Sequence, residues 1–150
     1  MPEVVTHRYD PAIGPCRNIC ALADREAEQV LDRLRRLRPT LKPDYLVRRR
    51  ATEQWLSQAA SRPMERPSYF FLGDFSHGED PSRPAALVIP LSNLPQHAMT
   101  FTLGDSMSVV ERRVYKLGEI GAHLRDGFGF SDQCGFQRRF IEMQLWRRDS

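Results

Sequence analysis

The sequence predicts an α+β fold in which an N-terminal helix pair packs on a mixed or antiparallel sheet of about five strands. Two segments with helical apolar spacing occupy about residues 21–60. Segments with strand periodicity follow over about residues 68–146, and mostly short connections join them. Strands that succeed one another with few helices between them are typical of α+β domains and not of doubly wound α/β sheets.

Length and composition predict a single domain over residues 1–150. A chain of 150 residues, 41% hydrophobic and 27% charged, suits one globular core. No apolar run approaches the roughly 18 residues needed to cross a bilayer. Residues 1–5 lack the basic and then apolar pattern of a secretory signal. We therefore expect a cytoplasmic protein with no membrane partner.

The first part of the chain is predicted to hold one strand and two helices. Val4–Tyr9 has strand character and is ended by Asp10-Pro11. Asp24 is a suitable N-cap for a helix with apolar residues at three-and-four spacing, which Pro39 ends. A second helix is expected over residues 44–60, with a weaker apolar pattern.

The later segments are predicted to form the sheet. Ala85–Ile89 is a continuous apolar run, which fits a strand buried on both faces. A short helix is expected at Gly118–Arg125. The other predicted strands are Ser68–Leu72, Met99–Leu103, Arg113–Leu117 and Phe140–Trp146.

The last of these strands has two different faces, because its side chains alternate. The aliphatic face suits a core and consists of Ile141, Met143 and Leu145, which we expect to meet Leu31, Leu34, Leu87 and Ile89. The other face places an acid and an amide between two aromatic rings, with Phe140, Glu142, Gln144 and Trp146 in that order. Glu142 is either a catalytic carboxylate or a solvent-facing strand residue, and the pattern leaves both open.

Three residues in separate segments resemble the pattern of ADP-ribosyltransferase-like enzymes: His7 in the first strand, Tyr69 at the start of an aromatic strand, and Glu142 in a late strand. The resemblance implies an enzyme that uses NAD, with His7 on the nicotinamide ribose, Tyr69 stacked on nicotinamide, and Glu142 assisting glycosidic cleavage. A carboxylate would stabilise the oxocarbenium-like ribose, and an aromatic face would hold the ring. The usual Gly-Leu segment after the histidine is replaced here by Asp10–Gly14.

Longer strings resemble a group of bacterial hypothetical proteins to which no activity is attached. The strings are Tyr69–Phe75, Val88–Leu91 and Phe140–Trp146. This resemblance implies a folded bacterial domain and brings no function with it.

A second function is a non-catalytic module that binds a protein or nucleic acid through an arginine-rich helical face. The basic residues gather between positions 33 and 50, with Arg48, Arg49 and Arg50 as the candidate binding residues. A solvated helix face explains the same cluster, because a single aromatic residue, Tyr45, interleaves with it, fewer than single-strand binding requires.

Neither the cysteines nor the Gly-Asp-Ser sequence predicts a further site. Cys16, Cys20 and Cys134 are an odd number of thiols without paired zinc spacing, so we expect reduced cysteines and no metal. Gly104-Asp105-Ser106 resembles the nucleophile block of GDS-type esterases, but the downstream Asp-x-x-His pair is missing. A turn explains it better.

Overall fold

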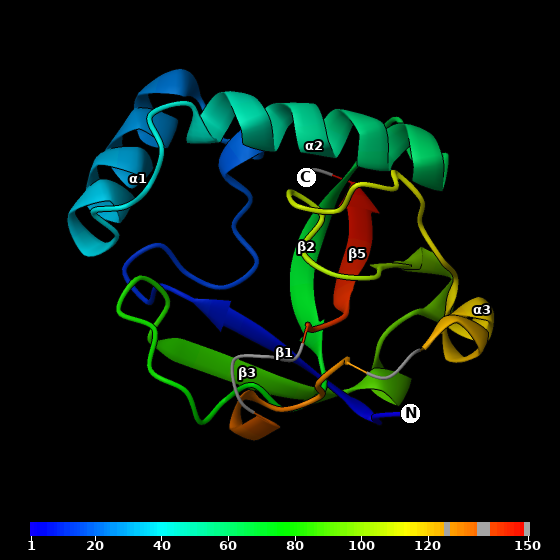
Figure 1. Ribbon diagram of the computed structural model, residues 1–150. Coiled ribbons are helices and arrows are strands. Elements are labelled where there is room, and N and C mark those ends of the chain that lie inside the picture. The colour runs from blue at the N-terminus through cyan, green and yellow to red at the C-terminus, as the bar shows by residue number, and fades with distance from the viewer. Residues whose placement is uncertain (125–126, 135–138, 149–150) are drawn as a thin grey trace.

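The protein has the predicted α+β architecture in a computed structural model that describes residues 1–124, 127–134 and 139–148 (Figure 1). The strands are β1 (Val4–Tyr9), β2 (Glu65–Leu72), β3 (Ala85–Pro90), β4 (Met99–Thr102) and β5 (Glu142–Arg148). The helices are α1 (Asp24–Leu37), α2 (Tyr45–Ala60) and α3 (Leu117–His123). Both N-terminal helices lie where their apolar spacing predicted them.

The described strands form one five-stranded sheet in the order β3-β1-β2-β5-β4, and every neighbouring pair is antiparallel. β1 therefore lies inside the sheet, and α1 and α2 are inserted between its first two strands along the chain. The β-rich part is accordingly not confined to the residues after 68. Nor are all helices N-terminal, because α3 follows β4.

One face of the sheet carries the main hydrophobic core, as the alternation in β5 predicted. Ile141 and Met143 are fully buried there with Val5, Phe70 and Leu72. The predicted core partners of Ile141 and Met143 were only partly right. Of the four, Ile89 packs against this cluster. Leu31 is buried but is not a member of it, and Leu34 is not among its packed neighbours either.

The prediction that β3 is buried on both faces was wrong. β3 pairs only with β1 and forms an edge of the sheet, where Leu87 is 39% and Val88 41% exposed. A continuous apolar run does not distinguish an edge strand from a central one, because periodicity reports side chains and not strand partners.

The opposite face of the sheet is covered by α2, which crosses above β2 and β5 in Figure 1. Trp55 and Leu56 of α2 pack with Trp146 of β5 in a second, smaller cluster. This helix buries the mixed polar and aromatic face of β5.

Two further predictions concern the segment after β4. The predicted strand Arg113–Leu117 is reduced to an isolated bridge between Tyr115 and Phe101. The predicted helix Gly118–Arg125 corresponds to α3, and Arg125 lies outside the described residues. In the described part of the chain, no helix has the length and apolar character needed to cross a membrane.

Candidate functional site

A cleft of about 530 Å³ lies between the N-terminal helices, the segment after β1, and the sheet. His7, Tyr69 and Glu142 all line it. They come from β1, β2 and β5, which are successive neighbours in the sheet (Figure 1). The antiparallel order thus brings together three residues that are far apart in the sequence.

Glu142 is enclosed at this cleft, since only 6% of the residue is exposed. β5 places it opposite Phe71 of β2 and Thr102 of β4. One carboxylate oxygen accepts a 2.6 Å hydrogen bond from Gln144 Nε2, and the other accepts a 3.4 Å bond from the Ser106 backbone N–H. Burial raises the pKa of Glu142, and the charge of Arg49 opposes this increase. The interpretation of Glu142 as a solvent-facing residue was wrong.

A chain of buried hydrogen bonds supports that carboxylate. Trp146 Nε1 donates to Thr100 Oγ1 at 2.7 Å, and the Thr100 hydroxyl donates to Gln144 Oε1 at 2.9 Å. Gln144 Nε2 donates to Glu142 and also to Thr102 Oγ1 at 3.0 Å. The Thr102 hydroxyl then donates to the Gly104 carbonyl at 2.8 Å. Gln144 is fully buried, so this chain fixes the Glu142 side chain without help from solvent.

Tyr69 lies beside Arg49 of α2, whose guanidinium carbon is 3.8 Å from the centre of the ring. This is a close cation–π contact. Burial raises the pKa of Tyr69 well above its usual value, and the charge of Arg49 works against that increase. The Tyr69 hydroxyl is buried and has no hydrogen-bond partner among the described residues.

Both ring nitrogens of His7 are bound to the main chain. Nδ1 lies 2.9 Å from the Tyr69 carbonyl oxygen, and Nε2 accepts a 2.8 Å hydrogen bond from the Cys16 N–H. A carbonyl only accepts, so Nδ1 donates the hydrogen bond in this arrangement. His7 thereby ties the segment around Cys16, which has a left-handed φ of 58°, to β2. This geometry makes His7 a positioning residue.

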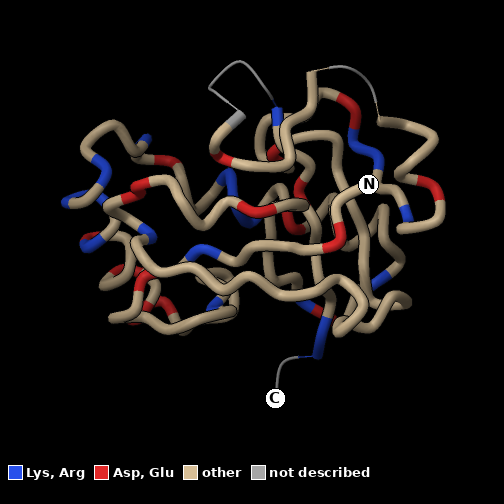
Figure 2. Tube along the Cα trace, turned by 90° about the horizontal axis from the view of Figure 1, so that it is seen from below, with Lys and Arg blue, Asp and Glu red and all other residues tan. Residues whose placement is uncertain are grey.

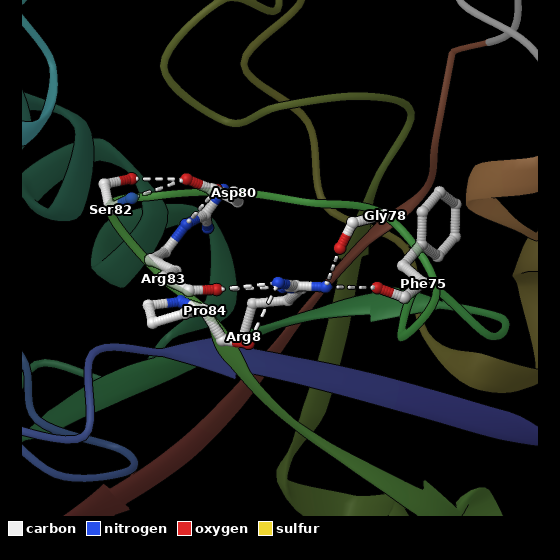
Figure 3. A network of polar contacts seen from close by, with 7 residues as sticks. All are labelled: Arg8, Phe75, Gly78, Asp80, Ser82, Arg83 and Pro84. Carbon is white, nitrogen blue, oxygen red and sulfur yellow. Dashed lines mark hydrogen bonds and ion pairs between the residues drawn. The ribbon is translucent and has the colours of Figure 1, made fainter.

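Arg8 fixes another wall of the cleft, and nothing in the sequence indicated this role. Arg8 is 8% exposed, and its guanidinium donates to backbone carbonyls of the loop between β2 and β3 (Figure 3). The acceptors are Phe75, Gly78, Arg83 and Pro84, at 2.8 to 3.3 Å. The loop that carries His77 and Glu79 is thus anchored to β1.

The three arginines proposed as a binding face do not share one surface. Arg48 and Arg49 line the cleft. Arg50 does not line it, and its guanidinium lies 3.5 Å from Asp24 Oδ1. Successive helical residues point about 100° apart, which explains the separation.

The two described thiols lie in different environments. Cys16 lines the cleft, and its hydrogen bond to His7 lowers the pKa of its thiol against the effect of burial. Cys20 does not line the cleft, and burial, with Glu53 nearby, raises its pKa to about 12. Ser106 is 2% exposed, and its neighbour Asp105 accepts a hydrogen bond from the Met107 N–H, as expected of a turn. Within the described residues, no group of three His, Cys, Asp or Glu side chains is arranged to hold a metal.

The comparisons with known proteins leave the site to be interpreted from its geometry. No protein-family model, curated protein or solved structure matches the chain.

Proposed function

We propose that the protein is a small ADP-ribosyltransferase-like enzyme that uses NAD, with Glu142 as its catalytic carboxylate. The observation that carries this proposal is the position of His7, Tyr69 and Glu142 along one cleft, on three neighbouring strands. A buried acid, held in one orientation by a hydrogen-bond chain, is the kind of preorganised charge that stabilises a cationic transition state.

In the proposed reaction, the bond between C1′ of the ribose and the nicotinamide nitrogen breaks. The electron pair leaves with the nicotinamide and neutralises its ring charge, while the ribose acquires oxocarbenium character. The ionised Glu142 stabilises that charge. An acceptor O–H or N–H then bonds to C1′ through its heteroatom, and Glu142 receives the proton. Water as the acceptor gives hydrolysis.

The other residues prepare this site in different ways. His7 links β2 to the segment around Cys16 through the hydrogen bonds of its two ring nitrogens. Tyr69 offers a ring for the flat nicotinamide, but Arg49 already covers one face at 3.8 Å. The nicotinamide therefore either uses the other face or displaces the guanidinium.

Incubation of the protein with NAD, followed by chromatographic measurement of released nicotinamide, tests the proposal. The native chain should release nicotinamide, and Glu142→Gln should reduce the rate at least about 100-fold. Glu79→Gln is the matched control, because Glu79 lies on an exposed loop and does not line the cleft. Absence of release by the native chain, or equal rates for the native protein and Glu142→Gln, would refute the proposal.

Activity should also depend on pH, because the pKa of Glu142 is raised by burial. Only the ionised carboxylate stabilises a cationic ribose, so the rate should rise with pH through a value above that of an ordinary glutamate. A rate that is already maximal in the ordinary carboxyl range would contradict the assignment of Glu142.

A further inference from the structure

Three of the basic residues that line the cleft have no acidic partner among the described residues. Figure 2 shows basic and acidic positions mixed over most of the chain, so net charge alone singles out no surface. Arg38 and Lys42 lie at and just after the end of α1, and Arg48 lies in α2. All three line the cleft. Among the described residues, none of the three has a carboxylate within ion-pair distance, unlike Arg17 and Arg83.

The acidic residues of the cleft are outnumbered by its basic residues. Asp10, Asp105 and Glu142 line the cleft, and Asp10 is already paired with Arg33. Neither Asp105 nor Glu142 lies within ion-pair distance of Arg38, Lys42 or Arg48 among the described residues. The helical wall of the cleft therefore presents uncompensated positive charge, which favours an anionic ligand.

Aromatic rings from the sheet, from neighbouring loops and from the start of α2 also face the cleft. Partly exposed rings line the same cleft: Tyr9, Tyr45, Tyr69, Phe71 and Phe140. Phe71 lies edge-on to Phe140 with their ring centres 4.8 Å apart. A cationic wall facing aromatic rings is the arrangement with which proteins bind single-stranded nucleic acids, phosphates on the cations and bases on the rings.

We infer that this cleft binds a single-stranded nucleic acid. Its phosphates contact Arg38, Lys42 and Arg48, and at least one base enters and stacks against an aromatic ring of the sheet side. A base reaches such a cleft only when it is unpaired, so a duplex is excluded. Binding of the strand does not rest on the function proposed above.

Fluorescence anisotropy with a labelled oligo-dT strand tests the binding without NAD. The logarithm of the affinity should fall with the logarithm of the salt concentration with a slope of about −2, as expected for three phosphate contacts on a single strand. An abasic strand of equal length should bind at least about fivefold more weakly, because it lacks stacking bases. A duplex should bind no better than the abasic strand.

Matched triple variants separate this cleft from general surface charge. Arg38→Gln, Lys42→Gln and Arg48→Gln together should weaken binding at least about tenfold. The control combines Arg25→Gln, Arg35→Gln and Arg36→Gln, which removes the same charge from exposed residues outside the cleft, and should weaken binding less than about threefold.

Equal loss in the two triple variants, or equal binding of abasic and intact strands, would overturn the inference. So would binding of pyrophosphate without binding of the strand, since the cations would then serve a small phosphate ligand. Nicotinamide release is measured separately and without any strand. A protein that releases nicotinamide but does not bind oligo-dT therefore refutes this inference alone, and the reverse result refutes only the proposed enzyme.

Discussion

Replacing Gln144 by leucine tests whether the buried hydrogen-bond chain holds the site together. Gln144 is fully buried and makes three hydrogen bonds, to Thr100, Thr102 and Glu142. Leucine has a similar size but makes none of them. The bond to the carboxylate is worth about 1.5–3 kcal/mol when charged, and the two neutral bonds about 0.5–1.5 kcal/mol each.

These values predict that Gln144→Leu lowers the free energy of unfolding by about 3–5 kcal/mol at neutral pH. Part of the loss arises because the Thr100 hydroxyl and the Glu142 carboxylate lose partners in a place that water does not reach. The variant should also move the rise of activity to higher pH, since Gln144 is among the groups that lower the pKa of Glu142.

Urea denaturation followed by circular dichroism measures the change in free energy. Gln96→Leu is the matched control, because Gln96 is exposed and the same chemical change there should cost less than about 0.5 kcal/mol. A loss below about 1 kcal/mol for Gln144→Leu, or a loss equal to the control, would refute the view that the chain of bonds supports Glu142.

Three further outcomes follow from the same structure. Ile141→Ala should lower the free energy of unfolding by about 2–5 kcal/mol in urea titrations, and Leu87→Ala on the exposed edge by less than about 1 kcal/mol. The stability of the native protein relative to Glu142→Gln should fall between pH 4 and pH 7, because the folded state binds the Glu142 proton more tightly than the unfolded state does. Urea titrations of both proteins at the two pH values measure this difference, in which the other carboxyl groups cancel. Alkylation of Cys20 at pH 8 should be slow in the folded protein and fast in urea, as peptide mapping can show, because its pKa of about 12 leaves little thiolate.

Local patterns predicted the elements of the fold better than their partners. Apolar spacing located α1 and α2, and alternation identified the two faces of β5. The position of β3 at the edge and of β1 inside the sheet depends on which strands pair, and no short window of sequence contains that information. The same limit explains why the core partners of Ile141 were only partly anticipated.

The sequence predicted three residues of the candidate site that lie on neighbouring strands of the sheet. His7, Tyr69 and Glu142 could be proposed from the sequence, and they line one cleft. The contribution of Arg8 could not be predicted, because its partners are backbone carbonyls of a distant loop. Every residue type has a backbone carbonyl, so the sequence does not mark these acceptors. Arg49 was singled out only as part of a basic cluster, and helical geometry separates it from Arg50.

The strongest reason to propose a catalytic role for Glu142 is the free energy that burial of its charge costs. Its neighbours Gln144, Thr100 and Thr102 show that this layer of the sheet is held by neutral groups. Burial of the Glu142 carboxylate costs desolvation free energy, and its raised pKa indicates that the hydrogen bonds from Gln144 and the Ser106 N–H, together with the charge of Arg49, do not fully offset that cost. In the proposed enzyme, that charge lies at the cleft, where it would stabilise a developing cation in a bound ligand.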